Sequence, residues 1–179
     1  MSWLLIRHGM TPGNERRAYI GSTDEPLSAD GRAALAKAAA LGEYPPADKI
    51  YVSPMLRCRQ TAEIIYPHVD AVVLDGLKER DFGIYEGKTF TELTSDAAYM
   101  KWVNSGGTLP FPGGEDDGCF RQRVLFAFDG IWRAEHRKRV AIIAHGGTIM
   151  TIMAERFAKK GEDAFSFQLA NGKFFEIPR

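Results

Sequence analysis

Two His-Gly pairs stand at the ends of apolar runs, and their side chains are well suited to chemistry. Arg7-His8-Gly9 follows the apolar residues 3–6, and His145-Gly146 follows the apolar residues 140–144. Two strands that each end in His-Gly can aim two imidazoles at one pocket, because ligands of α/β sheets bind outside the carboxyl ends of the strands. The pattern predicts phosphoryl chemistry on a histidine, without a metal.

The neighbours of His8 suit it to attack an anion. A guanidinium at Arg7 can clamp an anion through two hydrogen bonds, and its charge disfavours the imidazolium form of His8. The neutral imidazole is the form that a nucleophile needs. Gly9 lets the backbone turn sharply and approach a ligand closely. The alternative is a hydrogen-bonded loop histidine without a chemical role.

Further candidates for anion binding follow two other runs. We expect a helix with Ser53 as its N-cap and Pro54 in its first turn, so that Arg57 adds a cation where helix N-termini already favour anions. A solvated surface arginine is the alternative, and it is the preferred interpretation of Arg59. Gly146 and Gly147 would open a second helix with free N–H groups, which is a weak phosphate signal by itself.

A phosphate ester that breaks also needs a proton on its leaving oxygen. A carboxyl group that is partly buried near other anions can hold a proton at neutral pH. Glu79, Asp81 and Glu86 are all candidates for this proton donor. The alternative for each of them is a solvated carboxylate.

Composition bounds the class of protein. The 179 residues, with 23 Lys+Arg and 23 Asp+Glu, suit one domain over residues 1–179 and predict neither a nucleic-acid nor a membrane partner. Cys58 and Cys119 are expected to be reduced residues in or near the core. Without a signal peptide or an apolar run of roughly 20 residues, a soluble, cytoplasmic protein is expected.

Strand and helix patterns alternate along the chain. Strands are predicted at 3–7, 49–52, 71–74 and 139–144, with a closing edge strand at 174–177. Helices are predicted at 28–41, 53–66, 90–103, 115–135 and 147–159. This order predicts a three-layer α/β fold, with a mostly parallel central sheet flanked by helices. His8, Ser53 and His145 would then share one rim of the sheet.

These residues fall into ordered blocks that span nearly the whole chain. Together they resemble the histidine phosphatase superfamily, also called the phosphoglycerate mutase-like family. The individual blocks are Leu5-Ile6-Arg7-His8-Gly9-Met10-Thr11 with Asn14, Gly21 to Gly31, Ser53-Pro54-Met55-Leu56-Arg57-Cys58-Arg59-Gln60-Thr61-Ala62, Leu77-Lys78-Glu79-Arg80-Asp81-Phe82-Gly83 with Glu86-Gly87, Pro112-Gly113-Gly114-Glu115, and Ala144-His145-Gly146-Gly147.

The resemblance implies a role for each matching residue. His8 would be the nucleophile and form a phosphohistidine, and Glu79 would be the general acid and then the base that activates water. The residues that would hold the phosphoryl oxygens are Arg7, Arg57 and His145, helped by Asn14 and the N–H of Gly146. The loop Gly21, Ser22 and Thr23 would bind substrate. No metal and no cofactor is implied.

The substrate is less well defined by the sequence. The block 21–27 resembles small bacterial phosphatases such as α-ribazole phosphatase, which implies a metal-independent, acid-type phosphomonoesterase for α-ribazole phosphate, a sugar phosphate or a nucleotide. The segment 88–114 carries only Lys88 and Lys101 as cations, which disfavours the alternative, a cofactor-dependent phosphoglycerate mutase. A non-catalytic phosphate-binding regulator is a further alternative. Specificity is expected to come from loops in 14–23 and 88–114, and the protein to be a monomer or homodimer.

Overall fold

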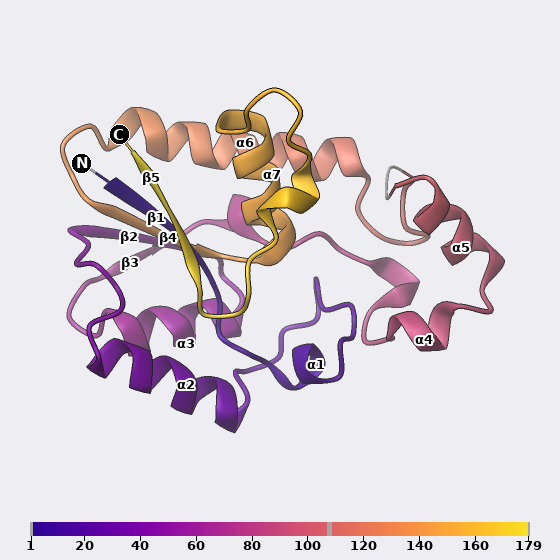
Figure 1. Ribbon diagram of the computed structural model, residues 1–179, viewed down its shortest axis with the longest axis horizontal. Helices are drawn as coiled ribbons and strands as arrows, with labels where there is room; N and C mark the ends of the chain where they lie inside the picture. The colour runs from indigo at the N-terminus through magenta and orange to yellow at the C-terminus, as the bar shows by residue number, and fades with distance from the viewer. Residues whose placement is uncertain (1, 107–108, 179) are drawn as a thin grey trace.

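The computed structural model describes residues 2–106 and 109–178, and a sheet lies at its centre (Figure 1). The sheet is built from β1 (Ser2–Arg7), β2 (Lys49–Val52), β3 (Ala71–Val73), β4 (Val140–Ala144) and β5 (Phe174–Pro178). In the described residues its order is β3-β2-β4-β1-β5. All neighbours pair in parallel except β5, which runs antiparallel to β1. The predicted, mostly parallel sheet with a closing edge strand is confirmed.

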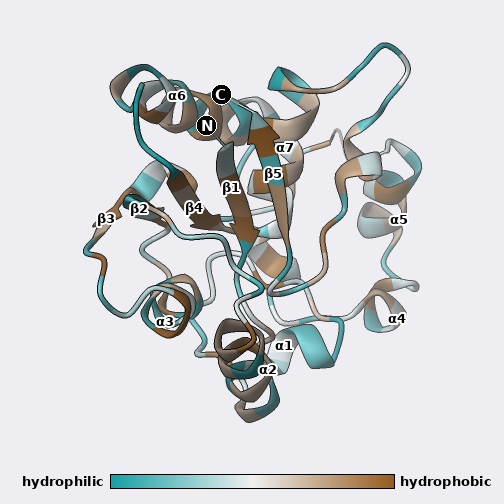
Figure 2. Ribbon diagram, turned by 60° about the vertical axis from the view of Figure 1, so that its left-hand side comes forward, coloured by the Kyte–Doolittle hydropathy of each residue, from teal (hydrophilic) through white to brown (hydrophobic). Residues whose placement is uncertain are grey.

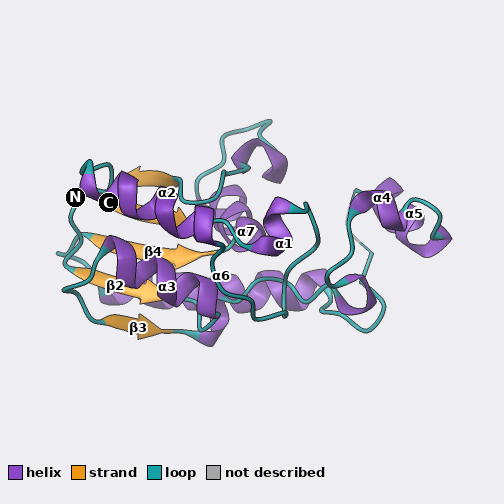
Figure 3. Ribbon diagram, turned by 90° about the horizontal axis from the view of Figure 1, so that it is seen from below, coloured by secondary structure: helices purple, strands orange, loops and turns teal. Residues whose placement is uncertain are grey.

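Helices cover both faces of the sheet. Successive residues of a strand face opposite sides of the sheet. On one face, Trp3 and Leu5 pack against α6 (Asp117–Ala134) and α7 (Gly146–Arg156). On the other face, Leu4 and Ile6 pack against α2 (Ala29–Ala40) and α3 (Leu56–Ile65). Figure 3 shows α2 and α3 together on one side of the sheet, and Figure 2 shows the apolar colour of β1, β4 and β5 between the helices. The three-layer α/β fold is confirmed.

One of the two helix caps predicted from the sequence is confirmed and the other is wrong. Ser28 accepts a hydrogen bond from the N–H of Gly31 and caps α2, as predicted. The predicted cap at Ser53 is wrong, because α3 begins at Leu56, after Met55, which makes no side-chain cap. The side chain of Ser53 points instead to His145, at 2.8 Å. A short helix that the sequence did not predict, α1 (Pro12–Glu15), is closed by a capping box between Thr11 and Asn14.

The single helix predicted over 90–103 is two helices. These are α4 (Phe90–Leu93) and α5 (Ala97–Asn104), separated where Asp96 accepts hydrogen bonds from the first N–H groups of α5. Both lie in a segment that projects from the sheet (Figure 1). That segment has its own buried cluster, formed by Tyr85, Leu93, Tyr99 and Phe111.

The two cysteines differ in environment. Cys58 is fully buried, as expected, and burial raises the pKa of its thiol to about 12. The expectation for Cys119 is wrong: it is exposed, because it lies off the apolar face of α6 that carries Phe120 and Val124. None of the described helices combines the length and the apolar character needed to cross a membrane.

Candidate active site

The polar residues that follow the parallel strands meet at one rim of the sheet. The N–H of His8 donates to the carbonyl of Ala144 at 3.0 Å, and the N–H of Ser53 donates to that of Ile143 at 3.0 Å. The imidazole rings of His8 and His145 consequently lie 5.2 Å apart, centroid to centroid. The structure thus brings together the three strand-end residues that the sequence placed on one rim.

His8 is held as a neutral imidazole with one free nitrogen. Its Nδ1 lies 2.7 Å from the carbonyl oxygen of Gly9. A carbonyl only accepts hydrogen bonds, so Nδ1 carries the proton and Nε2 keeps its lone pair. Only 4% of the residue is exposed. Burial, followed by the charge of Arg57, holds the pKa of His8 well below its usual value, and Arg7 acts in the same direction.

Residues far along the chain fix the loop of His8. Thr61 accepts from the N–H of Gly9 at 3.0 Å. The side-chain amide of Asn171 donates to the carbonyl of His8 at 3.2 Å and to Oδ1 of Asn14 at 3.0 Å. Neither contact is predictable from the sequence, because nothing local marks a contact made more than fifty residues away.

Arg7 offers a donor to the site. Its Nη1 donates to the carbonyl of Leu169 at 2.6 Å, whereas its Nε is buried and, among the described residues, has no hydrogen-bond partner. Burial lowers the pKa of Arg7, and Glu79 opposes this effect. A buried guanidinium N–H without a partner is unfavourable unless a ligand takes it, so Arg7 is suited to bind an anion.

Arg57 is fully buried and links His145 to a loop. Its Nε donates to Nδ1 of His145 at 3.3 Å, and its Nη1 and Nη2 donate to the carbonyls of Thr23 at 2.8 Å and Gly21 at 2.9 Å. Since Nδ1 of His145 accepts, Nε2 carries the proton and donates to Ser53. Burial, then Arg57, holds the pKa of His145 well below its usual value. His145 is therefore neutral, with both ring nitrogens engaged.

Glu86 binds the N–H groups of the loop 21–23, whose carbonyls accept hydrogen bonds from Arg57. Its carboxylate accepts from the N–H groups of Gly21, Ser22 and Thr23 and from the hydroxyl of Thr23, at 2.7 to 3.3 Å. Burial acts to raise the pKa of Glu86, but these bonds and one from the N–H of Phe82 lower it overall. A carboxylate stabilised in this way is a poor proton donor.

The pKa of Glu79 is shifted in the opposite direction from that of Glu86. Its Oε2 accepts from the N–H of Gly147 at 2.8 Å and its Oε1 from the N–H of Arg80 at 3.0 Å. Burial nevertheless raises its pKa, against these two bonds and the charges of Arg57 and Arg7. Asp81 is used locally, because its Oδ1 accepts from the N–H of Gly83 at 2.8 Å. Glu79, unlike Glu86, therefore lies where burial favours the protonated acid.

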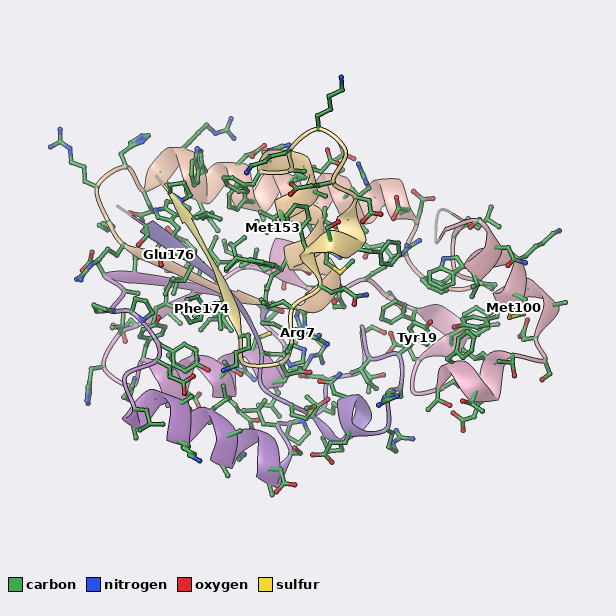
Figure 4. The ribbon with its side chains drawn as sticks, viewed as in Figure 1. Arg7, Tyr19, Met100, Met153, Phe174 and Glu176 are labelled. Atoms are coloured by element: carbon green, nitrogen blue, oxygen red, sulfur yellow. The ribbon has the colours of Figure 1, made fainter. Side chains whose placement is uncertain are left out.

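A cavity of about 600 Å³ lies at this rim and is lined by Arg7 and Glu79. Its polar walls include Arg7, Asn14, Glu79, Gln168 and the backbone of Gly146 and Gly147, and its apolar walls include Tyr19, Phe82 and Met150. Figure 4 shows Arg7 at the carboxyl end of β1, with Tyr19 between it and the projecting segment of α5.

The other predicted site residues are not among the described residues that line this cavity. His8, Arg57 and His145 are almost completely buried. Among the described residues, the lining does not include Gly21, Ser22 and Thr23, whose N–H groups are bound to Glu86. No group of three or more His, Cys, Asp and Glu side chains in the described part of the chain is placed to hold a metal ion.

The fold and the site define an α/β protein with buried imidazoles and guanidiniums around one strand-end cavity. The chain belongs to the histidine phosphatase superfamily (branch 1), whose family model matches residues 3–178, so the resemblance of the sequence blocks is confirmed. It is 34% identical to the uncharacterized phosphatase PhoE of Bacillus subtilis over 84% of this chain and 75% of that protein.

Two further similarities cover almost the whole chain. The sequence is 28% identical to the 2,3-bisphosphoglycerate-dependent phosphoglycerate mutase of Rhizobium etli, over 94% of this chain and 85% of the mutase. The fold matches the crystal structure of the alpha-ribazole phosphatase from Shigella flexneri with a TM-score of 0.85 and 25% identity, over 99% of this chain and 90% of that one. Phosphatases and a mutase are thus both among its relatives.

Proposed function

We propose that this protein is a metal-independent, acid-type phosphomonoesterase that works through a phosphohistidine, with residues 1–179 as one catalytic domain. One observation carries the proposal: the Nδ1 proton of His8 is held by the Gly9 carbonyl, which leaves Nε2 unprotonated beside two arginines. The substrate is a small phosphate ester, of the α-ribazole phosphate, sugar phosphate or nucleotide type.

In the first half of the reaction, Nε2 of His8 attacks phosphorus and the bond from phosphorus to the ester oxygen breaks. The leaving oxygen takes the bonding pair and the proton of Glu79. In the second half, the Glu79 carboxylate takes a proton from water, the hydroxide forms a bond to phosphorus, and the P–N bond breaks to restore His8. Such transfer depends on positioning and charge neutralisation.

The remaining groups hold the phosphoryl oxygens. Arg7 and Arg57 supply positive charge, and Asn14 and the N–H of Gly146 supply further donors. His145 orients Arg57 in the free protein through the bond to Nδ1. A bound phosphoryl dianion raises the pKa of His145, which then turns Nδ1 into a donor. Gly21, Ser22 and Thr23 act through Arg57, which donates to two of their carbonyls.

The alternative activity is that of a phosphoglycerate mutase. It is supported by the sequence similarity between this chain and the mutase of Rhizobium etli. A mutase must hold a second anionic group of its substrate. Lys88 lies over the ring of Tyr85, 6.0 Å from its centroid, and Lys101 is exposed on α5. The segment 88–114 therefore favours the hydrolase.

Trapping of the phosphoenzyme tests the proposal. The protein is mixed with p-nitrophenyl phosphate in EDTA, quenched in base, digested and analysed by mass spectrometry. We expect p-nitrophenol release with EDTA present, and an acid-labile phosphoryl group on the peptide that contains His8. A phosphoryl group on another residue, or activity that requires added metal, contradicts the proposal. Interconversion of phosphoglycerates that depends on 2,3-bisphosphoglycerate supports the mutase.

The pH profile of kcat/KM should have an acidic optimum. Burial, followed by the charge of Arg57, holds the pKa of His8 well below its usual value, so the nucleophile stays unprotonated into the acidic range. Burial raises the pKa of Glu79, so the acid keeps its proton to a higher pH than an exposed glutamic acid does. Activity toward an alkyl phosphate should rise through the pKa of His8 and fall through that of Glu79. An optimum on the alkaline side of neutrality contradicts this assignment.

Glu86→Gln should destabilise the loop at Gly21 without removing the acid of the reaction. The amide keeps one acceptor oxygen for the several donors that Glu86 binds, so we expect a loss of about 1–3 kcal/mol in the free energy of unfolding and weaker inhibition by inorganic phosphate. Denaturant titration and inhibition assays measure the two effects. If the falling limb of the pH profile disappears instead, Glu86 is the proton donor.

Gly147→Ala should lower kcat while leaving the fold intact. A Cβ at this position would lie 2.6 Å from Oε1 of Glu79, at the flexible end of that side chain, so the carboxyl group must move. We expect a loss of at least about tenfold for alkyl phosphates, because misplacing a catalytic group by about 1 Å has large effects. The matched control is Gly130→Ala in α6, where a Cβ meets nothing within 4 Å; equal kcat in both variants contradicts the prediction.

A further inference from the structure

A second cavity, of about 630 Å³, continues from the candidate active site. The two cavities share six lining residues: Tyr19, Glu79, Phe82, Gly147, Met150 and Gln168. The second cavity extends from there between α5, α7 and the 3₁₀ turn Ala164–Phe167. Glu79 therefore stands at the junction of the two cavities. If the phosphoryl group is bound by Arg7, the ester oxygen faces Glu79, and the rest of the leaving group is directed into the second cavity.

The walls of the second cavity are rich in aromatic rings. They come from the loops that carry Tyr19 and Phe82, from α4 (Phe90), α5 (Tyr99 and Trp102) and α6 (Phe120), and from the 3₁₀ turn (Phe165). Phe90 is 50% exposed and Phe165 is 61% exposed. Large apolar side chains that line a cavity and still face solvent lose unfavourable contact with water when an apolar ligand binds.

The charged residues of this cavity are already paired. Arg80 donates to Asp117 at 3.2 Å and to the carbonyl of Glu115 at 3.1 Å. Arg121 forms an ion pair with Glu155. An additional carboxylate or phosphate on the leaving group would have to compete with Asp117 and Glu155 for these two arginines. The described lining therefore disfavours an anionic leaving group.

We propose that the second cavity is a subsite for a flat aromatic or bulky apolar, uncharged leaving group. The proposal rests on the proposed hydrolase function and narrows its substrate class. The aromatic walls stack on such a group, and they hold the ester oxygen at Glu79 while it leaves. Phe165, at the exposed rim, is the specificity-determining residue that is easiest to change without disturbing the core.

The test compares esters with the same kind of leaving oxygen. The substrates are 2-phenylethyl phosphate, ethyl phosphate and 3-phosphoglycerate, and the variants are Phe165→Ala and Phe165→Tyr. We expect kcat/KM to be about tenfold or more higher for the phenylethyl ester than for the ethyl ester, as burial of a ring implies. Phe165→Ala should reduce this preference, chiefly by lowering kcat/KM for the phenylethyl ester, whereas Phe165→Tyr should keep the preference.

Matched controls separate the subsite from the reaction. Phe126→Ala, at a residue 77% exposed and outside the lining of this cavity, should leave the preference unchanged. Equal rates for the phenylethyl and ethyl esters, or a preference for 3-phosphoglycerate, overturn the proposal. Calorimetry with 2-phenylethylphosphonate and ethylphosphonate does not need turnover: tighter binding of the phenylethyl compound supports the subsite even if no ester is hydrolysed, and equal binding overturns it.

Discussion

His8→Ala should abolish the hydrolysis of p-nitrophenyl phosphate, with a fall in kcat on the order of 10⁴-fold or more. Removing a nucleophile eliminates the covalent route, and only the binding and charge neutralisation by the remaining groups persist. The loss should not depend on the leaving group, because even a good leaving group needs an attacking atom. Steady-state assays with p-nitrophenyl phosphate and an alkyl phosphate measure it.

The chain offers a matched histidine for the control. His68 lies on the surface, and His68→Ala should keep full activity. Circular dichroism on both variants separates loss of chemistry from loss of fold, and inorganic phosphate should still bind to His8→Ala because the arginines remain. Wild-type activity in His8→Ala would falsify the nucleophile assignment.

The placement of His8 and His145 could be predicted because the signal is local. A buried strand reads as a continuous apolar run, and parallel strands bring their carboxyl ends to one edge. These two facts put both imidazoles on one rim, and the structure places them 5.2 Å apart. The strand order β2-β4-β1 that makes them neighbours is set by long-range packing and was not readable from the runs.

The contacts that tune the site were not predictable in the same way. Glu86 was one of three equivalent acids in the sequence, and only the folded chain shows that it is committed to the backbone of Gly21 to Thr23. The sequence predicts a helix cap at Ser53, since Ser before Pro is a good start signal. Its hydroxyl instead holds His145, across more than ninety residues of sequence.

Only some of the residues that line the second cavity could be predicted from the sequence. Loops within 14–23 and 88–114 were expected to set specificity, and Tyr19, Phe90 and Trp102 do line the second cavity. Phe165 and Gln168 come from a turn near the end of the chain that carries no motif. Their proximity to Tyr19 depends on where α7 ends, which is a property of the packed structure.

Glu79→Gln should have the second large effect, and its size should depend on the leaving group. The amide is close in shape and can still accept the hydrogen bond from the N–H of Gly147, but it cannot give a proton away. For alkyl phosphates we expect kcat/KM to fall by about 10²- to 10⁴-fold. For p-nitrophenyl phosphate kcat/KM should fall much less, because the p-nitrophenolate anion leaves without being protonated.

Rapid mixing of Glu79→Gln with p-nitrophenyl phosphate then tests the second half of the reaction. If the same carboxylate activates water, phosphorylation of His8 stays fast while hydrolysis of the phosphoenzyme becomes slow. A burst of p-nitrophenol close to one equivalent should precede slow turnover, and the phosphoenzyme should accumulate.

Asp81→Asn is the matched control, since Asp81 closes a local turn, and it should show no such change. Wild-type rates for alkyl phosphates in Glu79→Gln would move the acid to Asp81 or Glu86. Loss of alkyl phosphate turnover without a burst would mean that Glu79 protonates the leaving group while another base activates water.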